Sequence, residues 1–156
     1  MRLLTDAMLG RLTTYFRMCG YDTAYTPDLG IESDDAIREY AQSENRLLLT
    51  RDRELAASAE DALLLRRREI ADQLQEVVDA GLDMSLPEVP ERCSACNGTV
   101  ERVPSDGPTP EYAPDPRSVD IWRCRQCKQH YWKGSHWDDV EETLAGLDCE
   151  SNPQRE

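Results

Sequence analysis

The chain has 156 residues and a formal net charge of -13, from 31 acidic side chains against 18 lysines and arginines. This length fits one ordinary domain or two small ones. No apolar run approaches the roughly 20 residues that a membrane span requires. A charge this negative argues against a protein that binds nucleic acid over its whole surface, because a phosphate polyanion would be repelled. We therefore expect a soluble cytoplasmic protein, with no membrane association and no signal peptide.

The first ninety residues alternate between strand and helix patterns. Strands are expected at residues 3–4, 23–26, 47–49 and 62–65, and the run at 47–49 is apolar throughout, as in a strand covered on both faces. Helices are expected at 8–19, with Cys19 facing the core, and at 34–41, 53–59 and 70–78. This order implies an α/β fold with a parallel sheet, flanking helices and right-handed crossovers.

Four of the six cysteines form two Cys-x-x-Cys pairs, Cys93 with Cys96 and Cys124 with Cys127, separated by 27 residues. Two such turns complete a tetrahedron of thiolates around one zinc ion. A disulfide framework is the first alternative, although nothing suggests secretion. A thioredoxin-like redox pair is the second, although that motif occurs singly. The spacing predicts a structural zinc with a closed coordination shell that leaves no position for a substrate.

The residues around these cysteines predict a small antiparallel zinc ribbon. Strands are expected at 99–103, 120–123 and 129–132, with a proline-rich loop at 104–117. A unit of this size has almost no core and depends on its metal. Linker composition at 84–91 separates a first domain, residues 1–86, from the ribbon, residues 91–147. Residues 148–156 are polar and are expected to form a disordered tail.

Acidic residues follow the predicted strands. Asp6 follows the first strand, Asp52 follows the strand at 47–49, and Asp34 and Asp35 open the helix between the second and third strands. Carboxylates that converge at the carboxyl edge of a parallel sheet repel one another, and a hard divalent cation relieves that repulsion. Magnesium or manganese held there supports phosphodiester hydrolysis. The alternative is that these residues serve only as helix caps.

Short segments spread in order over roughly residues 2–146 carry a family resemblance. They include LTDAMLGRL at 4–12, RMCGYD at 17–22, LLTRDREL at 48–55, RCSACNG at 92–98, WRCRQC at 122–127 and YWKGSHW at 131–137. Together with Asp34-Asp35 and Gln73-Leu74, these segments resemble the Mut-seven C-terminal RNase domain family, in which a PIN-like nuclease domain is fused to a zinc ribbon.

The resemblance implies a PIN-like fold and a metal-dependent endoribonuclease, a hydrolase of RNA. It assigns Asp6, Asp34 and Asp52 as catalytic residues and as ligands of magnesium or manganese, with Asp35 as an auxiliary carboxylate. A fourth acidic residue of the usual site has only two candidates here, Glu54 and Asp72. A weaker metal site, or a domain that binds RNA without cutting it, stays an alternative.

The knuckles of such a ribbon commonly place glycine after the last cysteine, where a left-handed backbone is favoured. Asn97 and Lys128 occupy these positions here. Asparagine tolerates a left-handed backbone well, and lysine adopts it with a modest strain. The zinc prediction therefore holds with these residues.

Arginine supplies local positive charge on an acidic chain, because guanidinium groups grip phosphate. Arg11 and Arg51 neighbour the acidic residues and are the first candidates for auxiliary RNA contacts. Further candidates are Arg17, Arg53, Arg66, Arg67 and Arg68, although the last three could instead pair with nearby carboxylates. In the ribbon, Trp132 and Trp137 are candidates to stack on bases, while His136 is interpreted as structural.

The acidic excess is spread along the chain, -8 over residues 1–90 (10 basic, 18 acidic) and -5 over 91–156 (8 basic, 13 acidic). With sixteen arginines and only two lysines, this composition suggests a halophilic-type acidic surface in a high-salt cytoplasm, where salt screens repulsion from RNA.

The sequence leaves three hypotheses for the function: a metal-dependent ribonuclease, a non-catalytic RNA- or ribosome-binding module, and a protein-interaction adaptor.

Overall fold

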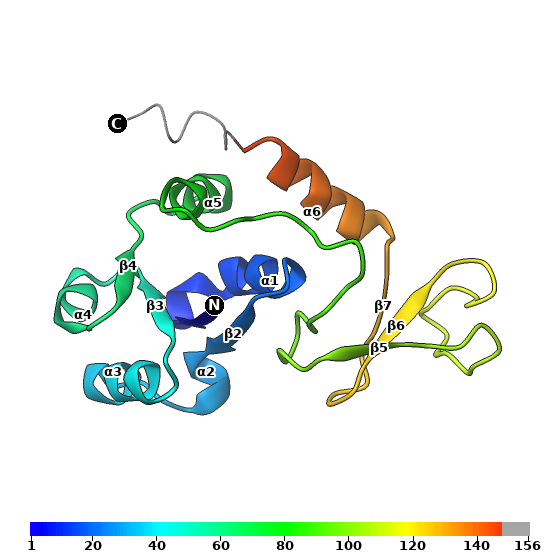
Figure 1. Ribbon diagram of the computed structural model, residues 1–156, viewed down its shortest axis with the longest axis horizontal. Helices are drawn as coiled ribbons and strands as arrows, with labels where there is room; N and C mark the ends of the chain where they lie inside the picture. The colour runs from blue at the N-terminus through cyan, green and yellow to red at the C-terminus, as the bar shows by residue number, and fades with distance from the viewer. Residues whose placement is uncertain (148–156) are drawn as a thin grey trace.

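Four short strands form a parallel sheet in the first half of the chain (Figure 1). They are β1 (Arg2–Thr5), β2 (Asp22–Tyr25), β3 (Leu47–Thr50) and β4 (Ala62–Leu64), in the order β2-β1-β3-β4. Leu4 of β1 lies level with Ala24 of β2 and Leu48 of β3. The predicted α/β class is confirmed, and each predicted strand lies within one residue of its observed position.

Helices cover both faces of this sheet. On one face, α1 (Gly10–Met18) and α5 (Ile70–Asp79) pack over a cluster that includes Leu3, Phe16 and Leu49. On the other, α3 (Asp34–Ser43) and α4 (Arg53–Ser58) pack over Leu4 and Leu48. The side chains of successive strand residues point to opposite faces, so an apolar strand supplies both layers.

Two short helical segments were not predicted. A 3-10 turn, η1 (Ala7–Leu9), joins Asp6 to α1, and a single turn, α2 (Thr26–Leu29), follows β2. Pro27 lies in the first turn of α2, where its missing N–H costs nothing, and Gly30 ends it with φ 69°. Cys19 packs against the α1 cluster as predicted, and burial raises the pKa of its thiol to about 12.

A second sheet follows, made of β5 (Val100–Arg102), β6 (Ile121–Cys124) and β7 (His130–Trp132), antiparallel in that order. The two turns that carry the cysteines lie beside these strands, as expected of a ribbon. The computed structural model describes residues 1–147, so the predicted disordered tail at 148–156 lies outside the described residues. Within residues 1–147, no helix has the length and apolar character needed to cross a membrane.

The last helix, α6 (Ser135–Ala145), was not predicted. Its buried residues Val140 and Leu144 belong to the same cluster as Phe16 of α1 and Leu74 of α5. Figure 1 shows α6 leaving the second sheet and running toward α5, and its buried residues join the cluster that α1 and α5 share. The chain therefore returns to the first sheet after the ribbon, and the predicted boundaries at residues 86 and 91 stay a prediction.

The first cysteine turn is bonded to the edge strand of the parallel sheet. The Thr23 N–H donates to Asn97 Oδ1 at 2.9 Å, and Asn97 Nδ2 donates to Asp22 Oδ1 at 2.8 Å. Arg17 spans the same junction, because its Nε donates to the Thr23 carbonyl at 3.0 Å and its guanidinium donates to the Ser94 carbonyl at 3.1 Å. A side chain of the cysteine turn thus satisfies an edge-strand amide that would otherwise be open.

Candidate active site and metal centre

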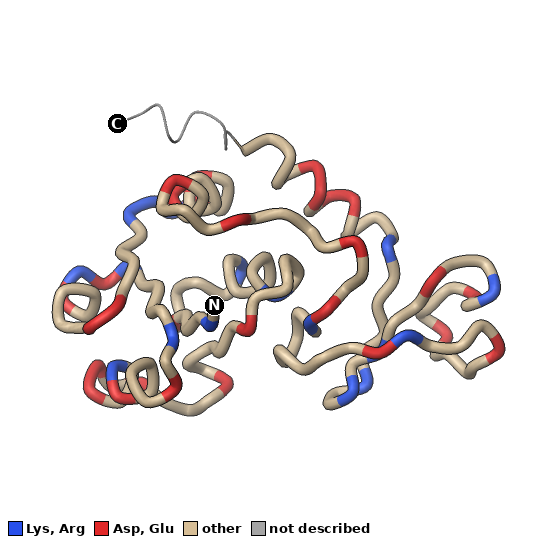
Figure 2. Tube along the Cα trace, in the orientation of Figure 1, with Lys and Arg blue, Asp and Glu red and all other residues tan. Residues whose placement is uncertain are grey.

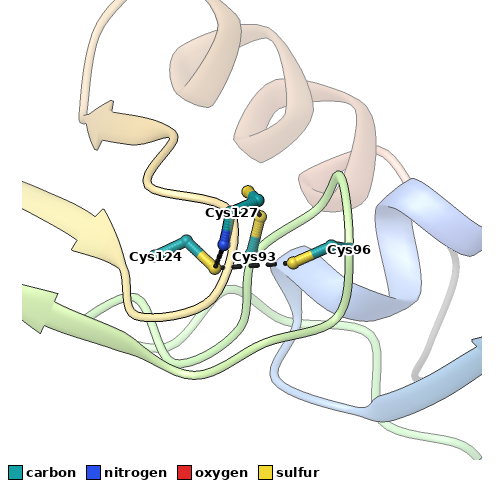
Figure 3. Close-up of side chains that lie close together, drawn as sticks. All are labelled: Cys93, Cys96, Cys124 and Cys127. Atoms are coloured by element: carbon teal, nitrogen blue, oxygen red, sulfur yellow. Dashed lines mark hydrogen bonds between the residues drawn. The ribbon is translucent and has the colours of Figure 1, made fainter.

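The four cysteine sulfurs converge on one point (Figure 3). All four lie within 4.8 Å of one another, with Cys93 and Cys127 at 3.6 Å and Cys96 and Cys124 at 3.5 Å. In a tetrahedral four-thiolate zinc site with Zn–S bonds of about 2.3 Å, sulfurs lie about 3.8 Å apart. The donor set therefore fits a metal ion such as zinc.

Backbone groups around Cys124 favour its thiolate form, whereas burial raises the pKa of Cys96 and Cys127. Burial raises the pKa of Cys124, but the N–H groups of Cys127 and Gln126 donate to its Sγ and bring the pKa down to about 7. Asn97 and Lys128, which follow the second cysteine of each pair, have φ values of 72° and 70°. The predicted left-handed positions are therefore confirmed.

The carboxyl ends of β1 and β3 form a topological switch point. The chain leaves β1 toward β2 on one side and leaves β3 toward β4 on the other, while β1 and β3 are neighbours. Ligands of open parallel sheets bind at this kind of crevice. Asp6 follows β1 directly, and Asp52 lies two residues beyond the end of β3.

Thr50 links these two aspartates. Its hydroxyl, which is fully buried, donates to Asp6 Oδ2 and accepts from the backbone N–H of Asp52 at 3.0 Å. Asp6 Oδ1 accepts from the Met8 N–H at 3.2 Å, and Asp52 Oδ1 accepts from the N–H groups of Glu54 and Leu55. Both aspartates are therefore helix caps, as the alternative interpretation held, but they are caps that share one threonine.

Asp6 is an unusual cap because it is only 8% exposed. Burial raises the pKa of its carboxyl, and the nearby Asp52 charge raises it further. The hydrogen bonds from Thr50 and Met8 and the charge of Arg51 act in the opposite direction. A buried carboxylate beside a second carboxylate is an arrangement that a cation would relieve.

The family comparison covers nearly all of this structure. The model of the Mut7-C RNAse domain matches residues 1–144. The chain belongs to this family. Membership points to a ribonuclease with RNA as its substrate. No match was found among curated proteins or among solved structures.

The structure of this Mut7-C RNAse domain brings together only some of the predicted site residues. Asp34 and Asp35 open α3, which returns from the carboxyl edge toward β3, and both are exposed. Arg38 forms an ion pair with Asp35. In the described residues 1–147, the four cysteines are the only group of three or more metal-ligand side chains with all ligand atoms within 4.8 Å. The structure thus joins Asp6 with Asp52, and a cation would have to draw in Asp34.

The remaining acidic candidates are less involved. Glu54 in α4 and Asp72 in the first turn of α5 are exposed.

Thr50 is the residue that sequence reasoning missed. Its signal is the Thr-x-Asp spacing at the end of a buried strand, which places a hydroxyl two residues before a carboxylate.

Arginines of the first unit fall into two groups. Arg2, Arg17, Arg38 and Arg46 form ion pairs. Within residues 1–147, no ion pair involves the side chains of the other six, which are Arg11, Arg51, Arg53, Arg66, Arg67 and Arg68. These six lie in the first turn of α1 or follow β3 and β4, all at the carboxyl edge. Within the described residues, the side chains of Arg66 to Arg68 form no ion pair, and the backbone N–H groups of Arg66 and Arg67 donate to the Glu76 carboxylate.

Two predicted RNA contacts are buried. Arg17 is 3% exposed and holds the junction with the cysteine turn, so its burial does not support a phosphate contact. Trp137 is 9% exposed at the start of α6, while Trp132 of β7 is half-buried. His136 is exposed rather than held in a core.

Replacing Asp6 by asparagine is expected to raise the melting temperature at neutral pH when no magnesium or manganese is added. The folded state raises the Asp6 pKa above 3.8, so this residue favours folding below pH 3.8 and loses that contribution as the pH rises through its folded-state pKa. Thermal melts of the zinc-loaded proteins from pH 3 to 8 should show a gap that opens as the pH rises above 3.8 and then stays constant. Asp61→Asn changes an exposed residue before β4 and should show no such gap in melting temperature. A lower melting temperature in Asp6→Asn than in wild type would contradict the interpretation of Asp6 as a destabilising buried carboxylate.

Proposed function

We propose that this Mut7-C RNAse domain is a PIN-like, metal-dependent endoribonuclease whose active site lies at the carboxyl edge of β1 and β3. The observation that carries the proposal is the pair of Asp6 and Asp52 at the switch point, joined through Thr50. A buried carboxyl with a raised pKa beside a second carboxylate is an arrangement typical of functional sites. Family membership supports RNA as the substrate.

Asp6, Asp34 and Asp52 are the residues that would hold magnesium or manganese. Carboxylate oxygens are the hard ligands that these cations prefer. Such a cation orients a phosphodiester, activates water and stabilises the leaving oxygen. The protein's part is to hold its ligands ready: Thr50 orients Asp6, and the amides of Glu54 and Leu55 orient Asp52.

RNA binding is assigned to the six arginines at the same edge. Their guanidinium groups are free of ion pairs within the described part of the chain, so phosphate can replace water around them. Figure 2 shows basic segments after β3 and between β4 and α5, next to the helices that rise from this edge. Arg51 neighbours the carboxylates, and its charge already acts on Asp6.

The four cysteines are assigned a structural zinc. With all four protein thiolates as ligands, the shell is closed, and the metal organises the second sheet and its junction with β2. The proposal is tested with zinc-loaded protein and single-stranded RNA. Cleavage that requires added manganese or magnesium supports it, whereas RNA binding without cleavage under either metal would favour the non-catalytic binding module.

A further inference from the structure

A pocket of about 230 Å³ lies between β7, the start of α6 and the end of α1. Five aromatic side chains and one arginine line it: His130, Tyr131, Trp132, His136, Trp137 and Arg92. The pocket is smaller than the roughly 300–1,000 Å³ that drug-sized ligands occupy. Its volume and its aromatic walls therefore suit one planar ring system.

The charge of this pocket differs from that of the molecule. The chain carries 31 acidic residues, but none of the described residues that line the pocket is acidic. Arg92, which also pairs with Asp22, supplies a positive charge, and the exposed His136 supplies an imidazole, whereas both ring nitrogens of His130 are buried. No side chain caps the first turn of α6 after Gly134, and Asp138 is the acidic residue within that turn, so this helix end adds little net charge to the region. A ligand with negative charge next to an aromatic ring fits these features.

The aromatic walls are held in place by their neighbours. The Tyr131 hydroxyl lies 2.9 Å from Cys93 Sγ, so the zinc site anchors this wall. Trp132 packs beside Tyr112 with ring centroids 6.2 Å apart, and Lys133 Nζ lies 5.3 Å from the Trp137 ring centroid. A Cβ at position 134 would come within 2.7 Å of Trp132 Nε1, so only glycine permits this packing. The pocket is therefore preorganised.

We propose that this aromatic pocket binds one unpaired nucleobase of the RNA that the domain cleaves, an inference that rests on the proposed function. Stacking on aromatic faces tolerates any base, because every base has a π-face. The Arg92 guanidinium, which also pairs with Asp22 at 3.8 Å and donates to the Asn97 carbonyl at 3.0 Å, is the cation of the pocket lining that would meet the backbone phosphate of that nucleotide. Helix α1 begins next to Asp6 and ends at Met18 in the pocket wall, and its nine residues span about 13 Å. A few nucleotides of single-stranded RNA can reach from the pocket to the acidic edge.

The test measures affinity separately from cleavage. Zinc-loaded full-length protein, without added magnesium or manganese, is titrated with a single-stranded RNA decamer and with a decamer whose bases are replaced by abasic spacers. Trp132→Leu should weaken binding of the RNA decamer roughly tenfold, the size expected for one stacked base, and should leave binding of the abasic decamer unchanged. If Trp132→Leu binds the RNA decamer as tightly as wild type does, or loses the same affinity for both decamers, the proposed base pocket is overturned.

A charge variant keeps the test decisive if Trp132→Leu fails to fold. His136→Glu places a carboxylate at an exposed pocket residue, and Ala145→Glu places the same charge at an exposed residue of α6 outside the pocket lining. Only His136→Glu should weaken RNA binding, and equal effects of the two would overturn the proposal. Manganese-dependent cleavage that is insensitive to His136→Glu rejects the pocket and keeps the nuclease. Pocket-dependent binding without cleavage keeps the pocket and rejects the nuclease.

Discussion

Asp6→Asn and Asp52→Asn are each expected to lower manganese-dependent RNA cleavage on the order of a thousandfold. Asparagine keeps the shape of aspartate and an oxygen that accepts the capping hydrogen bonds, but it removes the charge that would hold the cation. The two residues share Thr50, so either change removes a ligand from the same site. Single-turnover cleavage of a labelled single-stranded RNA measures the loss.

The control for this prediction is Asp61→Asn. Asp61 is an exposed aspartate that precedes β4, so it lies at the amino edge of the sheet, away from the switch point. Its loss should leave the cleavage rate within about twofold of wild type, which is the range of ordinary surface changes. Wild-type rates in both Asp6→Asn and Asp52→Asn, with zinc content and melting temperature intact, would sink the assignment of the acidic edge.

Loss of the zinc site is expected to destabilise both sheets. Structural zinc contributes about 10–16 kcal/mol of apparent binding energy in zinc-finger peptides, and the second sheet has little apolar core to replace it. Cys124→Ser should therefore lose the metal and abolish a cooperative transition in the second sheet. The effect should extend to β2, because Asn97 of the cysteine turn holds the Thr23 amide and the Asp22 carboxylate.

Thermal denaturation by circular dichroism, paired with metal analysis, measures this coupling. Cys19→Ala is the matched control, because Cys19 lies outside the cysteine cluster and should keep one metal per chain. Asn97→Ala should keep the metal but lower the free energy of unfolding by about 1–3 kcal/mol, since it leaves an edge-strand amide without its acceptor. A Cys124→Ser protein that melts at the wild-type temperature would refute a structural role for the metal.

The parallel sheet and the cysteine site could be predicted because their signals are local. The apolar run at 47–49 suits a strand buried on both faces, and the ends of β1 and β3 follow from the polar residues that stop them. The paired Cys-x-x-Cys spacing carries its own geometry. These features depend on a few neighbouring residues and a short-range rule.

The features that were missed depend on long-range contacts. Helix α6 has buried residues at Trp137, Val140 and Leu144, a helical spacing diluted by exposed acidic residues, and only its packing on α1 and α5 shows why it forms. Arginine is a residue type expected at the surface, yet the hydrogen-bond partners of Arg17 are the carbonyls of Thr23 and Ser94. Thr50 becomes informative only when β1 and β3 are placed side by side.

The overall charge gains meaning from the arrangement of the arginines. A net charge of -13 disfavours RNA binding at long range. Within the described residues, however, the unpaired arginines of the first unit lie at the carboxyl edge, whereas the ion-paired Arg17 and Arg46 also donate to backbone carbonyls of separate segments. The proposed RNA contact is therefore local, and it relies on short-range guanidinium and metal contacts that salt screens less than distant charges.

The most direct test of the acidic site is a crystal of the zinc-loaded protein grown with manganese, in which anomalous scattering locates each metal. We predict manganese bound to Asp6 and Asp52, with Asp34 turned toward it, and zinc at Cys93, Cys96, Cys124 and Cys127. Manganese scattered over exposed carboxylates, with none beside Asp6, would contradict a metal-dependent nuclease site at this edge.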